Sequence, residues 1–446
     1  MDIYLKYLFK EFYLRLLFSF ILTFILSITL DAKDIKSNTG SVSGQIRAMY
    51  LIDDLTNTFT PRNGSAYLLK LKYVTPTFAD NFKLTTAVYI NGDTGLTDFE
   101  DASKKKALGM FLREEGKVEA VLGEAYLEYK ADKVIARVGR QRLDTPLTKI
   151  AWSFVPFFYE SAFISLHPTK KLSTILGHIS ALSYGTREAA DFGLIGEKTG
   201  TAGTVRPMST QSDTGINRGD FINVGEAAGV AKTKGISLGA IKYKLNENFK
   251  VSIWDFYSHD IANSLYIDMN YKFPLANNGV KLSFDAQYLY QTQVGGSLVG
   301  DLDFSLYGFK VKLSSPDYSL FAAINKSGDG GEFFNAWGSD PGYTSSIFSR
   351  NEYRKDVTAY KLGFDYKLLS NLQLVVSYAN YGKSKTQGWG SVDAQDDATA
   401  INTVILYKPV KQWLLKIFNV RRTSEYNTPT TERKMNQYRF ITNYVF

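Results

Sequence analysis

The chain has 446 residues, enough for two or three soluble domains or for one large β-barrel. It contains no cysteine, which excludes disulfides, zinc-thiolate sites, iron-sulfur clusters and thiol nucleophiles. The 52 Lys and Arg against 44 Asp and Glu give a net charge of +8, but these basic residues alternate along the chain without forming a basic cluster, so nucleic-acid binding is not favoured.

One long apolar run lies at the N-terminus. Lys6, Lys10 and Arg15 precede Leu16–Leu30, which is apolar apart from scattered Ser and Thr. This order is typical of a secretory signal peptide, so we expect residues 1–32 to be the signal and residues 33–446 to be one membrane domain. A single transmembrane anchor is the competing interpretation. No second run of about twenty apolar residues follows, which excludes a multi-helix membrane protein.

From Ser41 onward, short segments alternate apolar and polar residues. Between residues 360 and 368, for example, Tyr360, Phe364 and Tyr366 share one face of an extended chain, while Lys361 and Asp365 share the other. A helix does not produce this period. Eighteen strands are predicted, with sixteen as the nearest competing count: 42–50, 66–74, 81–90, 123–130, 133–140, 160–167, 172–182, 235–245, 248–258, 263–272, 279–290, 303–313, 318–326, 357–367, 371–381, 399–408, 412–422 and 434–446.

The connections distinguish a membrane barrel from a soluble all-β protein, in which strands also alternate. Tight turns, such as those at 131–132, 314–317 and 409–411, come between longer stretches rich in Gly and charged residues. The long stretches are 91–122, 141–159, 183–234 and 327–356. Short periplasmic turns and long external loops are typical of outer-membrane barrels, and an even strand count places both chain ends on the periplasmic side. The sequence therefore predicts an all-β, antiparallel transmembrane barrel.

The last predicted strand is amphipathic and ends on an aromatic residue. Tyr438, Phe440, Tyr444 and Phe446 fall on one face, and Arg439 falls on the other. In a membrane barrel the aromatic face meets lipid and joins an interfacial girdle. An edge strand of a soluble sandwich would look similar. The pattern resembles the C-terminal signal of outer-membrane barrels, so we expect the barrel-assembly machinery and outer-membrane lipid as partners, in the outer membrane of a Gram-negative bacterium.

Several segments resemble a known family. The hairpin at 123–146, with Val138-Gly139-Arg140-Gln141 followed by Thr145-Pro146, looks like the OprD-like outer-membrane porins, as do the stretches 266–298 and 307–331 and the pair Tyr343-Thr344. The resemblance implies an eighteen-stranded monomeric or trimeric channel. It also implies a constriction made by inward-folded loops and a ladder of basic lumen residues that guides anionic groups.

The chain departs from the family just after Pro146. A polar segment is common there, whereas this chain has the aromatic residues Trp152, Phe154 and Phe157. We expect these three residues in a constriction loop. Two arrangements remain open: the loop folds into the lumen and narrows it, or it packs against the inner wall.

The alternation also predicts which charged side chains line the pore. More of them are basic than acidic, which predicts weak anion preference. Pairing of opposite charges across strands would cancel this bias. The predicted pore-lining residues are Arg47, Lys83, Glu124, Glu128, Arg137, Lys281, Asp285, Lys361, Asp365 and Arg439.

Catalytic chemistry has little support in the sequence. The chain has three His residues and no HExxH, GxSxG or P-loop motif, so no enzyme, cofactor or metal site is predicted. Whether a divalent cation bridges the loop carboxylates Asp93, Asp98, Glu100 and Asp101 stays open. We therefore expect a passive diffusion channel for small hydrophilic solutes or ions. The alternative is an outer-membrane adhesin or structural surface protein with a plugged barrel.

Overall fold

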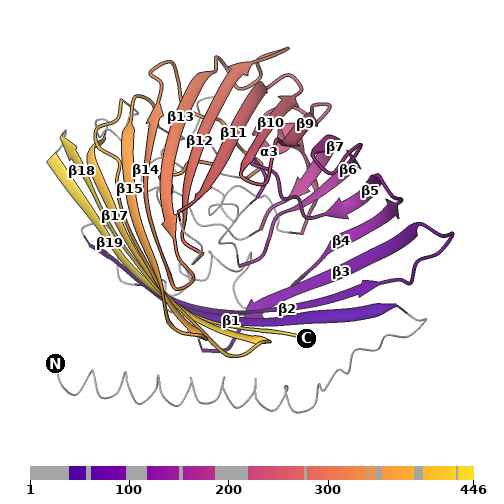
Figure 1. Ribbon diagram of the computed structural model, residues 1–446, viewed down its shortest axis with the longest axis horizontal. Helices are drawn as coiled ribbons and strands as arrows, with labels where there is room; N and C mark the ends of the chain where they lie inside the picture. The colour runs from indigo at the N-terminus through magenta and orange to yellow at the C-terminus, as the bar shows by residue number, and fades with distance from the viewer. Residues whose placement is uncertain are drawn as a thin grey trace.

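The computed structural model describes residues 40–56, 62–96, 118–149, 154–185, 219–275, 279–338, 341–346, 354–385, 395–427 and 430–446. The predicted signal peptide, Trp152 and the carboxylates Asp98, Glu100 and Asp101 lie outside these ranges. Most of the described residues belong to one antiparallel sheet, whose strands follow one another in chain order (Figure 1).

Within the described ranges, eighteen long strands form the wall, at the positions that the alternation predicts. The first nine are β1 (Ser41–Thr56), β2 (Arg62–Val74), β3 (Phe82–Asp93), β4 (Glu119–Lys130), β5 (Val134–Gln141), β6 (Phe158–Leu166), β7 (Leu172–Ser183), β9 (Ile236–Lys244) and β10 (Phe249–Ser258). The other nine are β11 (Ala262–Pro274), β12 (Lys281–Gln293), β13 (Asp303–Ser314), β14 (Tyr318–Ser327), β15 (Thr358–Leu369), β16 (Leu372–Asn380), β17 (Gln395–Val410), β18 (Trp413–Asn427) and β19 (Thr430–Val445). The prediction of eighteen strands is confirmed.

A further two-residue strand, β8 (Ile222–Asn223), pairs only with the end of β7, and β7 pairs with β9 along the rest of its length. Helix α3 (Val224–Ala227) follows β8 and is capped by Asn223, whose side chain accepts a hydrogen bond from the Gly225 backbone. In the described part of the chain, no helix has the length and apolar character needed to span a membrane.

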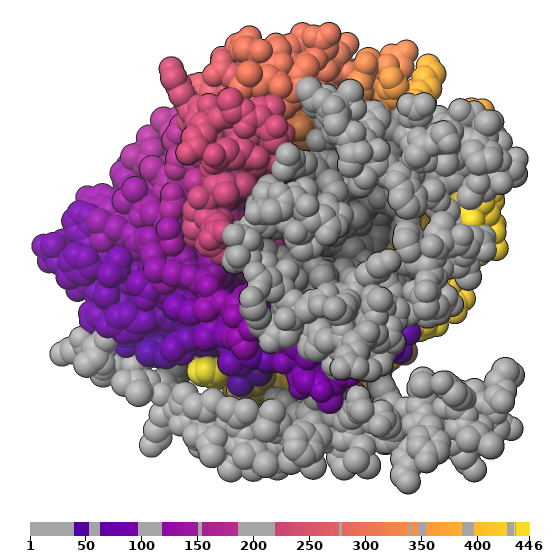
Figure 2. All heavy atoms as spheres, turned by 180° about the vertical axis from the view of Figure 1, so that it is seen from behind, coloured from indigo at the N-terminus to yellow at the C-terminus, as the bar shows by residue number. Residues whose placement is uncertain are grey.

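The last strand closes the barrel against the first. β1 pairs with β2 on one side and with β19 on the other, in a register that sets Arg47 opposite Asn443 and Tyr50 opposite Phe440. The terminal residue takes part in this seam, because the Gly44 N–H donates to the Phe446 carbonyl at 2.8 Å. Among the described long strands, closure leaves no unpaired edge, as a membrane-spanning sheet requires. Figure 2 shows the wall from the opposite side, with the colours running round it from indigo to yellow.

The two faces of the wall differ in chemistry. The outer face exposes large apolar side chains on alternate residues, such as Leu362 (59% exposed), Phe364 (37%) and Met269 (41%). Their neighbours in sequence point inward, and many are polar and buried, including Gln287 and Gln437. A band of apolar side chains around the outside is the surface that lipid covers in outer-membrane barrels.

The two rims differ in the length of their connections. We call the rim that holds the start of β1 the turn rim, because it has short connections such as 131–133, 315–317 and 370–371. The opposite rim, the loop rim, carries the long connections 94–118, 142–157, 184–235 and 328–357. The loop rim also has short connections, and the shortest are 259–261 and 428–429, because their strands stay paired almost to their ends.

Candidate pore and its constriction

The connection between β5 and β6 folds inside the barrel. Phe154 and Val155 are buried among inward-facing wall residues of β1 to β4. Phe157 packs instead with β7 residues and meets the ring of Tyr184 edge-on, with 5.3 Å between ring centroids. The Arg47 guanidinium donates a hydrogen bond to the Phe154 carbonyl at 2.9 Å, which ties this segment to β1. The described part of the segment therefore packs on the inner wall, which is one of the two arrangements left open by the sequence.

A second inward segment comes from the connection between β14 and β15. Its sequence Phe333-Phe334-Asn335-Ala336-Trp337 is almost fully buried. The side-chain amide of Gln291 on β12 holds the Phe334 backbone by two hydrogen bonds, at 2.9 Å from Nε2 to the carbonyl and 2.8 Å from the N–H to Oε1. Such paired bonds satisfy buried backbone groups that have no strand partner. Sequence reasoning placed this stretch in a long loop and did not predict that it enters the lumen.

The two inward segments touch each other. Asn335 Nδ2 donates to the Leu147 carbonyl at 3.2 Å, and the Tyr159 hydroxyl lies 2.7 Å from the Trp337 carbonyl. The Tyr184 hydroxyl donates to the Ala336 carbonyl at 3.0 Å. Because these bonds join residues about 150 to 190 positions apart in the chain, the two loops form one internal layer.

Most of this layer packs against one side of the barrel, whereas Phe154 and Val155 pack on β1 to β4 and Thr344 contacts β14. We define the inner apolar cluster as the buried residues of this layer together with the buried residues of β6 to β13, and of the connections between these strands, that pack with them. Burial of each large apolar side chain contributes about 1.5–3 kcal/mol, so the packing holds the segments firmly against this side. The inner apolar cluster comprises Leu147, Phe157, Tyr159, Ile179, Leu182, Tyr184, Val224, Ala227, Ala228, Ile236, Leu238, Ala240, Trp254, Phe256, Ile261, Ala262, Tyr266, Leu289, Val299, Leu302, Phe304, Leu306, Phe333, Phe334, Ala336 and Trp337.

The opposite side of the lumen is basic. Lys70 and Lys72 on β2 both reach Glu124 on β4, each with a nitrogen-to-oxygen distance of 3.2 Å. Glu124 is only 5% exposed and also accepts a hydrogen bond of 2.6 Å from the Tyr89 hydroxyl. On the neighbouring strands, Lys416 lies 5.0 Å and Arg439 5.2 Å from the centre of the Phe418 ring.

We define the basic side of the lumen as Arg47, Lys70, Lys72, Lys416 and Arg439, which come from β1, β2, β18 and β19. Among the described residues, Glu124 is the carboxylate that forms ion pairs with members of this group. The basic residues outnumber the carboxylate, so this side is electropositive. Fixed charges of one sign inside a narrow passage attract ions of the other sign.

Other predicted pore residues are paired. Arg137 meets Glu128 at 2.6 Å, and Asp285 meets Lys310 at 3.1 Å. Asp365 accepts a hydrogen bond from Gln373, and Lys361 donates to the Ser345 carbonyl. Opposite charges therefore cancel at Arg137 and Asp285, whereas Asp365 and Lys361 hydrogen-bond to neutral groups. Lys83, opposite Glu128 on the neighbouring strand, and Lys281, at the turn rim, are exposed.

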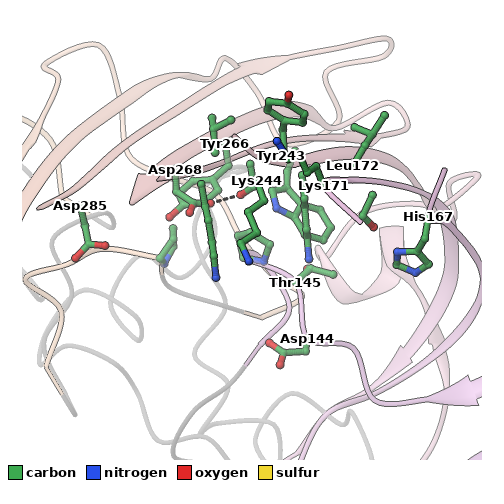
Figure 3. A pocket seen from close by; sticks show the side chains of 18 of the residues that line it. Asp144, Thr145, His167, Lys171, Leu172, Tyr243, Lys244, Tyr266, Asp268 and Asp285 are labelled. Atoms are coloured by element: carbon green, nitrogen blue, oxygen red, sulfur yellow. Dashed lines mark hydrogen bonds between the residues drawn. The ribbon is translucent and has the colours of Figure 1, made fainter. Parts of the chain in front are cut away.

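An open cavity of about 810 Å³ lies on the turn-rim side of the internal layer (Figure 3). Inward side chains of β9 to β12 form its wall, residues 167–171 form its mouth, and Thr145 and Tyr343 of the two inward segments face it. Burial and the field of Asp285 raise the pKa of the Tyr343 hydroxyl, so it remains a neutral hydrogen-bond donor.

An ion-pair group holds two connections at the loop rim. The Asp356 carboxylate receives Lys326 at 2.7 Å and Lys385 at 2.8 Å. The hydrogen bonds from these two ammonium groups lower the pKa of Asp356 to about 2. Because Lys385 comes from the connection after β16, the group links that connection to the one before β15.

No group of three or more His, Cys, Asp or Glu side chains is placed to hold a metal ion within the described ranges. His178 and His259 both hydrogen-bond to the Ser237 hydroxyl, at 3.2 and 3.0 Å, and His167 lies at the mouth of the cavity. The three histidines therefore form no common site.

A family model described as "outer membrane porin, OprD family" matches residues 198–446. Solved structures of similar fold include Pseudomonas aeruginosa OccK9 (OpdG), with 16% identity and a TM-score of 0.72, covering 91% of this chain and 97% of that one. P. aeruginosa OpdK with vanillate has 11% identity and a TM-score of 0.69, with coverage of 91% and 98%. P. aeruginosa OccK2 (OpdF) with glucuronate has 12% identity and a TM-score of 0.69, with coverage of 91% and 97%. No curated protein sequence matches the chain.

Proposed function

We propose that solutes cross the barrel of this protein, which belongs to the OprD family of outer-membrane porins, along the basic side of the lumen. The protein is a porin of the outer membrane, and porins let solutes diffuse without catalysing a reaction. The proposal has two parts, which are the route that solutes take through the lumen and a weak preference for anions over cations.

The observation that carries the route is the asymmetry of the lumen. The inner apolar cluster is closely packed against β6 to β13, and such packing leaves no path for hydrated solutes. On the opposite side, the side chains of Lys70 and Lys72 point into the lumen and remain 17% and 25% exposed. Water reaches these ammonium groups, so a polar path along this side is favourable.

The preference for anions follows from the charges beside that route. Arg47, Lys416 and Arg439 lie on adjacent strands, and Glu124 offsets part of the charge of Lys70 and Lys72. Ions within about 8 Å of these groups feel them at physiological salt. The solved neighbours OpdK and OccK2 were crystallised with vanillate and glucuronate, which are carboxylate anions, and this supports small carboxylates as solutes.

Cysteine accessibility tests the route, because the chain has no native cysteine. Lys72→Cys places a thiol on the basic side, and Ala240→Cys places one in the inner apolar cluster. We expect a negatively charged methanethiosulfonate reagent to modify Lys72→Cys rapidly and lower its channel conductance, and to leave Ala240→Cys unmodified. Rapid modification of Ala240→Cys with a protected Lys72→Cys would contradict the route.

The remaining sequence predictions stay proposals. We propose that residues 1–32 are a cleaved signal peptide, and the mass of the protein purified from outer membranes tests this. We also propose that the assembly machinery reads the strand ending at Phe446, and that barrels associate as trimers. Deletion of Phe446 should reduce the amount of folded barrel in the membrane, and chemical cross-linking in membranes should give a trimer band.

A further inference from the structure

The cavity at the turn rim holds an unusual set of charges. Six lysines line it, against three aspartates. They come from separate parts of the chain: the inward segment, the turn between β6 and β7, and strands β9 and β10. The six lysines are Lys149, Lys170, Lys171, Lys242, Lys244 and Lys250.

Three of these lysines stand side by side. Lys244 and Lys250 are direct cross-strand partners on the inward face of β9 and β10. Lys171 is next to them, because its carbonyl accepts the Lys244 backbone N–H at 2.8 Å. Like charges directly opposite each other destabilise a sheet, so this row lowers stability unless negative charge lies against it.

The carboxylates of the described residues offset this charge only in part. Glu247, in the turn between β9 and β10, meets Lys244 at 2.6 Å, and Asp144 meets Lys149 at 3.0 Å. The hydrogen bond and field of Lys244, and then the fields of Lys250 and Lys171, lower the pKa of Glu247. Among the described residues, Lys171 and Lys250 form no ion pair of their own.

The other aspartates of the cavity have partners elsewhere. Asp285 is held by Lys310, and Asp268 accepts a hydrogen bond from Ser252. Figure 3 shows Lys171 and Lys244 reaching into one space, with Asp268 and Asp285 farther along the wall. Aromatic side chains complete the cavity, and the ammonium group of Lys242 lies 4.7 Å from the centre of the Trp254 ring.

We propose that this cavity is a binding vestibule for small anions that carry two or more negative charges, with Lys171, Lys244 and Lys250 as the main contacts. The proposal rests on the function above, since it places the vestibule at the turn-rim end of the pore. An anion with several oxygens accepts from several ammonium groups at once, whereas a singly charged anion neutralises one. Pyrophosphate and polycarboxylates share this chemistry.

The test is block of single-channel current by inorganic pyrophosphate, added to one side of a planar bilayer at a time. We expect stronger block from the turn-rim side, and none from acetate at the same ionic strength. The triple variant Lys171→Gln, Lys244→Gln, Lys250→Gln should raise the half-blocking concentration by at least about tenfold, because it removes three positive charges beside the anion. The matched control is Lys133→Gln, Lys408→Gln, Lys411→Gln, which removes the same charge from turn-rim positions outside the cavity.

Equal half-blocking concentrations in the triple variant and the control would overturn the proposal, as would normal channel steps that pyrophosphate leaves unchanged. If the protein gives no channel steps, the proposed function fails and the vestibule is tested separately. Calorimetric titration of pyrophosphate into the detergent-solubilised barrel should then still show binding to the control variant and at least about tenfold weaker binding to the triple variant. Equal calorimetric affinities would overturn the site.

Discussion

Replacing Glu124 by Gln should make the pore more selective for anions. The substitution removes the carboxylate that Lys70 and Lys72 share and keeps the size of the side chain. The Tyr89 hydroxyl, now 2.6 Å from the carboxylate, can donate to the Gln amide oxygen instead. The main change is therefore one unit of charge on the basic side of the lumen.

The size of the effect follows from Coulomb's law. A unit charge about 5 Å from the ion path in a water-like dielectric is worth about 0.8 kcal/mol, and salt screening reduces this to about 0.5 kcal/mol. The local concentration of anions should then rise roughly two- to fourfold, and that of cations should fall by the same factor. We expect a shift of the reversal potential toward anion preference at low salt that fades as salt is raised.

Glu124→Gln should lower the free energy of unfolding by less than the loss of a fully buried ion pair would. Breaking a fully buried ion pair costs about 3–5 kcal/mol, but both lysines here keep some contact with water, so we expect about 1–2 kcal/mol. Glu425→Gln is the matched control, because Glu425 is exposed at the loop-rim end of β18. An unchanged reversal potential in Glu124→Gln, or a shift toward cations, would refute a route beside Lys70 and Lys72.

Three further changes test other parts of the structure. Phe364→Arg puts a charge on the lipid face and should lower the free energy of unfolding by roughly 2–4 kcal/mol, whereas Asp365→Arg, on the inward face, should be tolerated. Urea unfolding in lipid vesicles measures the free energy of unfolding of both variants. Equal losses of this free energy would contradict the assignment of the two faces. Arg137→Glu sets two carboxylates together at Glu128 and should move the reversal potential toward cations, with no movement expected only if this pair lies away from the ion path. The depressed pKa of Asp356 keeps its carboxylate ionised at neutral pH, so the stability that it adds should be complete above pH 3.8 and lost as pH falls through about 2. Hydrogen exchange of residues 354–357 should therefore be constant in protection from pH 7 to 4 and reduced in Asp356→Asn at all these values; a loss of protection in the native protein near pH 6 would count against the group.

The wall of the barrel could be predicted from the sequence because each strand carries its own pattern. Alternation assigned Phe364 to the outside and Asp365 to the inside from neighbouring residues alone. Closure by the last strand could also be predicted, since the aromatic face ending at Phe446 needs lipid on one side and a partner strand beside it.

The interior could be predicted only in part, because it depends on contacts between distant segments. Phe154 and Phe157 were assigned to a constriction loop from their apolar character, and both are buried inside the barrel. The partner of that loop, centred on Asn335, was missed, although a run of aromatic residues within a polar loop was a visible signal. Lys72 and Lys416 were also missed, but alternation along β2 and β18 would have placed both inside.

Strand periodicity does not predict which side chains of different strands contact each other. The pattern placed Glu124 in the lumen, but its shared contact with Lys70 and Tyr89 requires the register of three strands and the bulge between β3 and β4. Such a register is set by the closed barrel as a whole, and single-strand patterns do not contain it.

The most direct test of the account is the reversal potential of the unmodified protein in a planar bilayer under a potassium chloride gradient. A basic lumen predicts stable single-channel steps and a reversal potential displaced modestly toward chloride, more at low salt than at high salt. A folded, reconstituted barrel with no steps would contradict an open route, and strong potassium preference would contradict the basic side of the lumen as the path that solutes follow.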